Sequence, residues 1–391
     1  MDTKTMETRK IEEELNNSLL YQMSLGSREL YHSNVWAWLM KNDSNFVKVF
    51  FPNFNDEDYS VTSVERENNH RDIIIRFQKK EPSEKKEKYF YVIENKIKSL
   101  HNKGQLEKYS KDLGDHSLLE GAFTGIENNL EEKEITFQKS EGNKVAWHFV
   151  SYADIAERIL NCASDSQNEL IKAKFAQIEE YCGIIENIYR LLDDELKKNP
   201  KRLIYDCDEA LAELKLEDIF IKLKGAHFFQ YVMKNLTMEE FESNGFHHDS
   251  NSRVSFNNKK ATLDFRFTNW SEEDTDYTTI GIQIERYQYR FLVQRNGTHS
   301  KDEVFEAYKE KKWFDENFDP TQKERFLFDK PTKLKGSKGS KGKKYDGYEG
   351  DAYVFVYQYY DINNDNNQYD DILSAIRKDL EKLKKIFDNK E

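Results

Sequence analysis

Cysteine and proline are both scarce in this chain, which has three cysteines and five prolines among 391 residues. Cys162, Cys182 and Cys207 are odd in number and far apart, so they fit neither a disulfide framework nor a metal-ligand spacing. We therefore expect a reducing, cytoplasmic location. Long hydrophobic runs are lacking too: none approaches the roughly 18 residues of a membrane span, so we expect no membrane partner. The N-terminal segment also lacks the continuous apolar core of a signal peptide.

Basic residues are outnumbered, with 60 Lys and Arg against 72 Asp and Glu and a net charge of −12. This balance counts against a protein that coats nucleic acid nonspecifically, because attraction to phosphate scales with local positive charge. It does not exclude an enzyme with a basic groove on an acidic body. The chain length suggests about two domains, and a hydrophobic content of 37% is enough for each to bury a core.

The first half of the chain has the pattern of strands flanked by helices. Dense runs of β-forming residues predict buried strands at 60–67, 71–78 and 88–96. The polar link between the last two contains a proline and fits a hairpin turn. Helical spacing predicts a helix at about 104–113, and the run "VAWHFVSY" at 145–152 predicts a further strand.

Helical periodicity also predicts two N-terminal helices, at residues 5–24 and 27–41. The second should bury one set of apolar side chains, which are Leu30, Val35, Trp38 and Leu39. Residues 168–199 carry one apolar stripe and predict a single helix of about 30 residues, roughly 45 Å long. Pro200 would end it, so we expect one domain over 1–200 and a second over 201–391.

The second half predicts an α+β domain built on an antiparallel sheet. Alternating β-formers indicate strands at 261–267, 278–287, 289–294 and 352–361. A final amphipathic helix is expected at about 367–388. The tyrosines of "YQYRF" and "YVFVYQYYD" fit a half-buried sheet, and stacking on nucleic-acid bases is the alternative. The lysine-rich stretch at 330–344 fits either a solvated loop or a contact with a nucleic-acid backbone.

One short motif carries the chemistry: an acid and a lysine end the apolar strand "FYVI". Strand geometry points Glu94 and Lys96 to one face and Asn95 to the other. Asp72 opens the preceding strand and would lie beside Glu94 if the two strands form a hairpin. Adjacent carboxylates repel each other unless a proton or cation intervenes, and Mg²⁺ prefers such oxygen ligands. Lys96 would then hold or help deprotonate a metal-bound water.

A purely structural interpretation of this motif is open as well. Glu and Lys two residues apart on a strand often form a surface ion pair worth less than about 1 kcal/mol. The context favours function, because Glu94 ends one apolar run and Asp72 opens another. A helical segment with Gln105 and Tyr109 on one face follows.

Four segments together resemble the PD-(D/E)xK nuclease superfamily: "ELYHSNVWAWLM", "RENNHRDIII", "YFYVIENKI" and "GQLEKYS". The first resembles the "ELxHSNxxAWLL" helix of a bacterial branch of that superfamily. The similarity covers roughly 27–115 and the strand near 145–152. It implies a restriction-endonuclease-like αβββαβ core, with a mixed sheet flanked by helices.

The resemblance also implies roles for individual residues. Asp72 and Glu94 would be the metal-binding acids and Lys96 the catalytic lysine, with Mg²⁺ as the cofactor and Mn²⁺ as a substitute. Asn95 would offer its backbone carbonyl to the metal, and Glu29 an extra or water-mediated contact.

The flanking residues would complete such a site. Gln105 is expected near the reaction centre, in contact with substrate or water. Tyr109 would share its helix face, and Arg71 would meet a phosphate. Glu67 fits two roles equally, an acid behind the metal ligands or a solvated turn residue.

The leading hypothesis is therefore a Mg²⁺-dependent nuclease acting on nucleic acid, with DNA favoured over RNA from the resemblance alone. A role in bacterial defence against phage or foreign DNA comes from the same source. The second domain would choose the substrate, form a homo-oligomer or sense a trigger. The rival hypothesis is a non-catalytic nucleic-acid-binding or regulatory module that retains the nuclease fold. A dormant effector, activated through the second domain, is a third.

Overall fold

The computed structural model describes most of the chain. The described residues are 6–17, 20–21, 28–68, 70–80, 89–96, 103–111, 118–125, 133–138, 144–243, 245–248, 254–257, 260–269, 277–314, 345–362 and 368–388. The lysine-rich stretch at 330–344 lies outside them. Among the helices described, none has the length and apolar character needed to cross a membrane.

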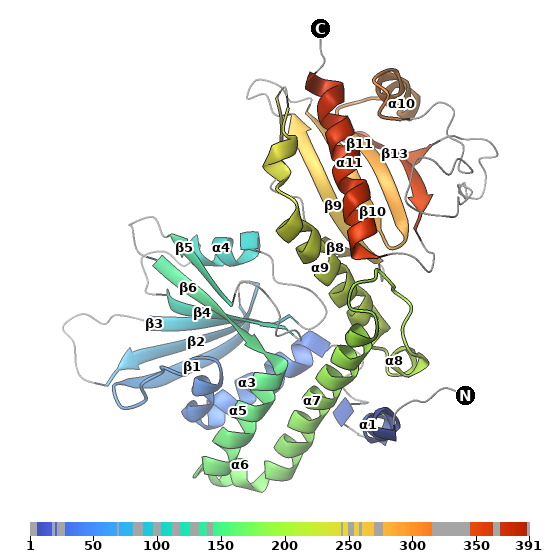
Figure 1. The fold of residues 1–391 in the computed structure, drawn as a ribbon. Coiled ribbons are helices and arrows are strands. Elements are labelled where there is room, and N and C mark those ends of the chain that lie inside the picture. Colours follow the sequence, from blue (N-terminus) through green and yellow to red (C-terminus); the bar gives the residue numbers. More distant parts are fainter. Residues whose placement is uncertain are drawn as a thin grey trace. The chain divides into compact units, whose positions relative to one another are not determined.

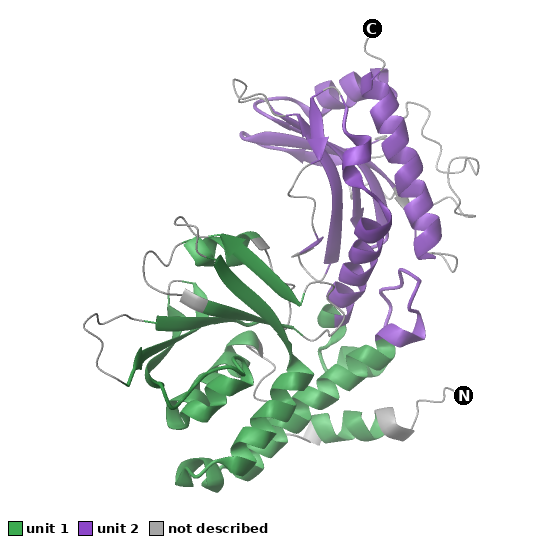
Figure 2. Cartoon of the chain, turned by 60° about the vertical axis from the view of Figure 1, so that its left-hand side comes forward, with its two compact units in different colours: residues 1–195, 208–219 green, residues 196–207, 220–391 purple. Residues whose placement is uncertain are grey.

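Two compact units divide the chain (Figure 2). Unit 1 contains residues 1–195 and 208–219, and unit 2 contains residues 196–207 and 220–391. The domain boundary expected at residue 200 stays a prediction.

A mixed six-stranded sheet with the order β1-β2-β3-β4-β6-β5 forms the centre of unit 1 (Figure 1). Its strands are β1 (Tyr59–Asn68), β2 (Arg71–Lys79), β3 (Tyr89–Glu94), β4 (Leu118–Gly125), β5 (Glu134–Gln138) and β6 (Lys144–Ser151). The first three strands are antiparallel, β4 runs parallel to β3 and to β6, and β5 is antiparallel to β6. The mixed α/β fold class and the three strands predicted before the central helix are confirmed.

The sequence pattern did not reveal β4 and β5. Strand β4 has the sequence LLEGAFTG, in which Gly121 and Gly125 interrupt the run of β-formers. A Cβ at Gly121 would lie 2.3 Å from the indole of Trp147, so the glycine is needed for close packing of β4 against β6. Because β4 directly follows the central helix and lies beside β3, it completes the αβββαβ core. The strand predicted at 145–152 is β6, which lies next to β4 on the side away from β3.

The helices of unit 1 are α1 (Met6–Asn17), α3 (Arg28–Asn42), the 3₁₀ helix η1 (Ser44–Val49), α4 (Lys103–Lys111), α5 (Tyr152–Asp165), α6 (Glu169–Ala173), α7 (Phe175–Lys198) and α8 (Glu209–Glu213). The single helix predicted over 168–199 is wrong, because the helix breaks at Lys174. Apolar spacing continues across the break through Ile171, Phe175 and Ile178, so periodicity gives no sign of it.

Helix α3 buries only part of the predicted face, since Leu39 is 1% exposed but two of the other predicted residues are exposed. Leu30 and Trp38 are 39% and 37% exposed, whereas His32, Ser33 and Trp36 are at most 2% exposed. Apolar spacing misled the prediction because two polar side chains occupy the buried face. Each has a hydrogen-bond partner inside unit 1, which makes its burial tolerable.

Unit 2 is built on an antiparallel sheet with the order β12-β13-β11-β10-β9-β7, and β8 also pairs with β9. Its strands are β7 (Phe246–His248), β8 (Val254–Asn257), β9 (Lys260–Asn269), β10 (Thr278–Glu285), β11 (Gln288–Asn296), β12 (Asp346–Glu349) and β13 (Tyr353–Asp361). Its helices are α9 (Glu217–Asn235), the 3₁₀ helix η2 (Met238–Phe241), α10 (Lys301–Glu310) and α11 (Tyr369–Asp388). The predicted antiparallel sheet and final helix are confirmed, whereas α9 and α10 were not predicted.

Candidate active site

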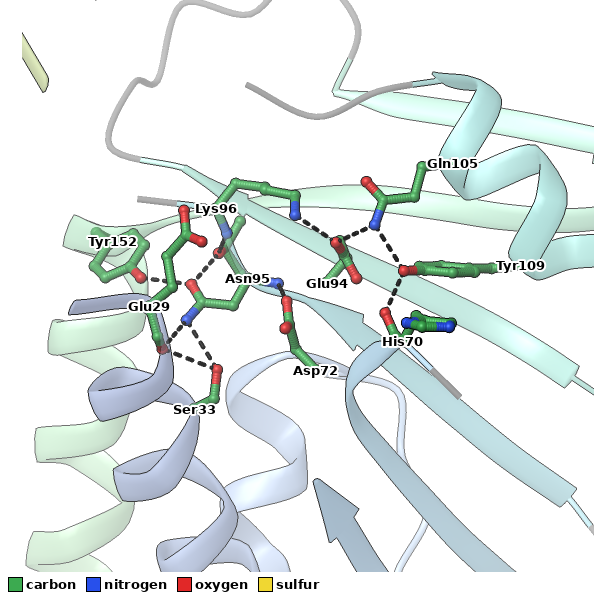
Figure 3. Close-up of polar contacts among 11 residues, drawn as sticks. Glu29, Ser33, His70, Asp72, Glu94, Asn95, Lys96, Gln105, Tyr109 and Tyr152 are labelled. Atoms are coloured by element: carbon green, nitrogen blue, oxygen red, sulfur yellow. Dashed lines mark hydrogen bonds and ion pairs between the residues drawn. The ribbon is translucent and has the colours of Figure 1, made fainter. Parts of the chain in front are cut away.

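The hairpin of β2 and β3 brings the two predicted acids together (Figure 3). Ile73 pairs with Ile93 in the antiparallel register, so the next positions outward are Asp72 and Glu94. Directly opposite residues of an antiparallel pair project from the same face of the sheet. The sheet therefore places both carboxyl groups on one face, at the end where Asn95 and Lys96 follow.

Burial makes both acids difficult to ionise. Glu94 is 1% exposed, and burial followed by the charge of Asp72 raises the pKa of Glu94 to about 7. Burial also raises the pKa of Asp72 to about 6, although the Asn95 backbone N–H donates to Asp72 Oδ2 at 2.6 Å and opposes the shift. The charge of Glu29 adds to both shifts. An ion-free site of this kind favours protons on its carboxyl groups.

Lys96 contacts this pair directly. Its Nζ lies 2.6 Å from Glu94 Oε1, and the two side chains are 15% and 2% exposed. Burial lowers the pKa of Lys96, but the charge and hydrogen bond of Glu94, together with Asp72 and Glu29, outweigh burial and raise that pKa. Lys96 therefore stays a cation in a site that contains several acids.

Helix α4 supplies the second contact to Glu94. Gln105 Nε2 donates to Glu94 Oε1 at 2.8 Å and to Tyr109 Oη at 2.6 Å, one helical turn further on. The Tyr109 hydroxyl in turn donates to the backbone oxygen of His70. The guanidinium carbon of Arg71 lies 5.2 Å from the centre of the Tyr109 ring. The structure thus gathers Gln105, Tyr109 and Arg71 on one side of Glu94.

The turn that leads into Asp72 has an unusual backbone. Glu67 and His70 have φ angles of 51° and 64°, in the left-handed region that non-glycine residues rarely adopt. The hydrogen bond from Tyr109 to His70 holds the end of this turn. The charge of Glu67 contributes to the raised pKa of Asp72, so Glu67 lies close enough to influence the site.

Asn95 connects the site to the rest of unit 1. Its side chain is fully buried, and its Nδ2 donates to Glu29 O at 2.7 Å and to Ser33 Oγ at 2.9 Å. Its Oδ1 accepts from Thr124 Oγ1 at 3.0 Å and from Tyr152 Oη at 2.5 Å. These four hydrogen bonds join α3, β4 and α5 to the end of β3, and Figure 3 shows most of them.

Thr124 and Tyr152 are parts of this network that the sequence pattern did not reveal. Thr124 lies on the unpredicted strand β4. The pattern predicts Tyr152 as the last residue of a strand, but this residue begins α5, after the N-cap Ser151. The serine before an apolar helical stretch was the signal that could have placed the helix start correctly.

The donor set fits a hard divalent cation. Glu94 Oε2 is buried and has no hydrogen-bond partner, although Oε1 has two. A buried carboxylate oxygen without a partner is costly unless a proton or cation satisfies it. Within the described residues, no three His, Cys, Asp or Glu side chains form a group that could hold a metal. A cation here would combine Asp72 and Glu94 with backbone or water oxygens, as Mg²⁺ commonly does.

The fold and these contacts define a class of protein: a mixed-sheet α/β domain with an Asp on one strand and a Glu-x-Lys at the end of the next. Residues 18–183 match the family model described as the PD-(D/E)XK nuclease superfamily. Unit 1 thus carries a PD-(D/E)XK nuclease superfamily domain, and the resemblance inferred from four short motifs is confirmed. No curated protein and no solved structure gives a significant match to the chain.

Proposed function

We propose that this protein is a metal-dependent nuclease that hydrolyses phosphodiester bonds, with DNA as the favoured substrate. The proposal rests mainly on one contact. Lys96 lies against the buried Glu94, which shares its sheet face with Asp72. A domain of the PD-(D/E)XK nuclease superfamily surrounds these residues. Burying two acids beside each other is costly for folding, and this cost is understandable where the acids bind a cation.

In this proposal Asp72, Glu94 and the backbone carbonyl of Asn95 hold Mg²⁺, for which Mn²⁺ can substitute. Glu29 contributes through a water molecule. The bound ion would polarise the scissile phosphate and make a coordinated water more acidic. Asp72 and Glu94 must lose their protons before they can bind it, since their pKa values are raised to about 6 and about 7.

The other side chains position the reactants. Lys96 is a cation with its Nζ on the Glu94 carboxylate, so it can orient the attacking water and stabilise negative charge on the phosphate. Gln105 restrains Glu94 by donating to Oε1. Arg71 and Tyr109 bind the substrate backbone, for which the planar guanidinium is well suited.

A non-catalytic nucleic-acid-binding module is the second candidate. The net charge of −12 is equally unfavourable for a DNA enzyme and for a nucleic-acid-binding module outside a localised groove, so it does not favour this candidate. Against it stands the full set of Asp72, Glu94 and Lys96, because a binding module has no need of a buried acid pair. In either case unit 2 would choose the substrate, mediate a homo-oligomer or receive a trigger. Defence against foreign DNA in the cytoplasm is the role that we propose for the enzyme.

A cleavage assay tests the proposal. The protein is incubated with plasmid, linear duplex, single-stranded DNA and RNA, in Mg²⁺, in Mn²⁺ and in excess EDTA. The wild type should cut at least one DNA substrate only with a metal, and Lys96→Ala should lower the rate by roughly 100-fold or more.

Lys48→Ala is the matched control, because Lys48 pairs with Asp56 at the surface and should cut as the wild type does. Equal cleavage by Lys96→Ala and wild type would assign the activity to another centre or to a contaminant. Absence of cleavage under every condition would favour the binding module or an enzyme that awaits a trigger.

A further inference from the structure

The sheet of unit 2 has two chemically different faces. On one face, apolar side chains pack under helices: Phe265 stacks on Phe229 of α9 at 5.4 Å. On the same face the Tyr289 hydroxyl donates to Asp379 of α11, at 2.9 Å. Figure 1 shows α11 crossing this face. The side chains that alternate with these project from the opposite face, where polar and aromatic groups gather.

A row of aromatic rings lies on this opposite face, along β12 and β13. Tyr353, Phe355 and Tyr357 are alternate residues of β13 and therefore share a face. Tyr348 of β12 pairs directly with Phe355 and joins them. We call these four residues the aromatic strip. The ring centres of Tyr348 and Tyr353 lie 5.4 Å apart, and those of Phe355 and Tyr357 lie 5.5 Å apart.

The aromatic strip is open to solvent at one end. Tyr348 is 56% exposed and Tyr353 is 39% exposed, whereas Phe355 and Tyr357 are half-buried. The intervening residues Val354 and Val356 are fully buried on the helix-covered face. The half-buried sheet expected from the sequence is therefore confirmed for this strand. A contiguous row of partly exposed rings is unusual on a surface that has no partner, so it points to one.

The arginines beside the strip are already paired. Arg290 contacts Glu285 at 2.7 Å and lies 4.4 Å from the centre of the Tyr357 ring. Arg266 contacts Asp264 at 2.6 Å. These arginines contact carboxylates, and Asp346 of β12 adds a further acid, because it lies opposite Tyr357 and accepts from its hydroxyl at 3.3 Å. Among the described residues, the surface next to the strip therefore has no excess positive charge to attract a phosphate. A partner that fits it presents flat, uncharged π faces, as nucleobases do.

We propose that the aromatic strip of unit 2 binds unpaired bases of single-stranded nucleic acid by stacking. This inference rests on the proposed nuclease function and deepens it, because it names single-stranded segments as the substrate that unit 2 recognises. Bases in a duplex are stacked on each other and offer only their edges, whereas unpaired bases expose the faces that aromatic side chains need. The strip contributes no cation, so its share of the affinity should change little with salt.

Fluorescence anisotropy with a labelled oligo-dT strand, and with the same label on a duplex, tests the proposal. The full chain is used, in EDTA so that no cleavage occurs. Tyr353→Ala and Tyr348→Ala should each weaken binding of the single strand roughly fivefold or more, in proportion to the stacking lost. Tyr353→Phe keeps the ring and should bind as the wild type does, whereas Tyr353→Leu keeps only apolar bulk and should bind weakly.

Leu170→Ala is the surface control, since Leu170 is a 43% exposed apolar residue on α6 of unit 1 and does not belong to the strip. Equal binding by Tyr353→Ala and wild type, or tighter binding of duplex than of single strand, would overturn the proposal. So would a wild-type dimer in sedimentation that Tyr353→Ala dissociates without changing oligonucleotide affinity, because a second copy would then be the occupant.

The same variants separate this inference from the proposed function. If Lys96→Ala abolishes cleavage while Tyr353→Ala binds normally, the nuclease proposal stands and the aromatic strip fails. If no condition gives cleavage but Tyr353→Ala loses single-strand binding, the strip stands and the nuclease proposal fails.

Discussion

At the scale of single residues, Glu94 is the group on which the account depends. One of its oxygens receives both Lys96 and Gln105, and the other is buried without a hydrogen-bond partner. Asp72 adds a like charge on the same face. An arrangement of this kind costs folding free energy at neutral pH, which natural proteins accept mainly where the site performs chemistry.

This cost predicts a specific pH dependence of stability. The pKa of Glu94 rises from its ordinary value of 4.5 to about 7 in the folded protein. A carboxyl group whose pKa is raised by folding favours the folded state below pH 4.5, and this contribution is lost as pH rises to about 7. Metal-free Glu94→Gln should therefore gain stability relative to wild type between these pH values, on the order of 2 kcal/mol.

Urea unfolding in EDTA, at pH 4.5 and at pH 8, measures the effect. Glu107→Gln is the control, because Glu107 forms an exposed pair with Lys111 and should show no such pH-dependent gain. A Glu94→Gln variant that is less stable than wild type at pH 8 would show that Lys96 and Gln105 more than offset the burial of the charge.

Replacing Asn95, in contrast to Glu94, should lower the stability of the fold. The Asn95 amide makes four hydrogen bonds to Glu29, Ser33, Thr124 and Tyr152. Asn95→Ala removes them and leaves buried donors without acceptors, so it should lower the free energy of unfolding by roughly 3 kcal/mol. Asn42→Ala loses a single exposed bond to a helix carbonyl and should cost less than about 1 kcal/mol. Similar unfolding midpoints for both variants would contradict the conclusion that the hydrogen bonds of Asn95 stabilise unit 1.

At the scale of elements, glycine provides a matched pair of tests. A Cβ at Gly121 of β4 would lie within 2.3 to 2.6 Å of the Trp147 ring, which is fully buried and bonded to Ser110 at 2.9 Å. Gly121→Ala should therefore lower stability by about 1–3 kcal/mol. A Cβ at Gly183 of α7 would meet no atom within 4 Å, so Gly183→Ala should raise stability by up to about 1 kcal/mol.

Thermal unfolding of both variants beside wild type provides the measurement. Equal shifts of the same sign would mean that packing of β4 against β6 does not require a glycine at position 121.

The sequence predicted some elements well and others poorly, for physical reasons. Strands β1, β2 and β3 are dense in β-formers and were found within two residues at each end. The acid pair followed from strand alternation and a hairpin register, both of which are local rules. Strand β4 was missed because Gly121 serves packing against Trp147, a contact between residues 26 positions apart.

Helix α3 shows where periodicity fails. Its buried face includes His32 and Ser33, which are acceptable there only because Tyr181 and Asn95 reach them from distant parts of the chain. The same limit hid Thr124 and Tyr152, whose importance lies in their contacts with Asn95. A pattern read along the chain cannot supply a partner that only tertiary folding brings close.

At the scale of the whole molecule, the net charge of −12 would have to coexist with the polyanionic substrate of the proposed nuclease. The proposed division of labour resolves this conflict, since unit 1 would meet phosphates through a metal and Arg71. Unit 2 would bind bases through stacking, which does not depend on net charge. Divalent ions would then strengthen substrate binding as well as permit cleavage.

The most direct test of the central claim is calorimetric titration of the full chain with Mg²⁺ at pH 8. The account predicts saturable binding to the wild type, weaker binding at pH 5.5 where both acids retain protons, and loss of binding in Asp72→Asn and in Glu94→Gln. Glu107→Gln should bind as the wild type does. A wild type that takes up no Mg²⁺, or variants of both acids that bind it undiminished, would contradict a cation held between Asp72 and Glu94.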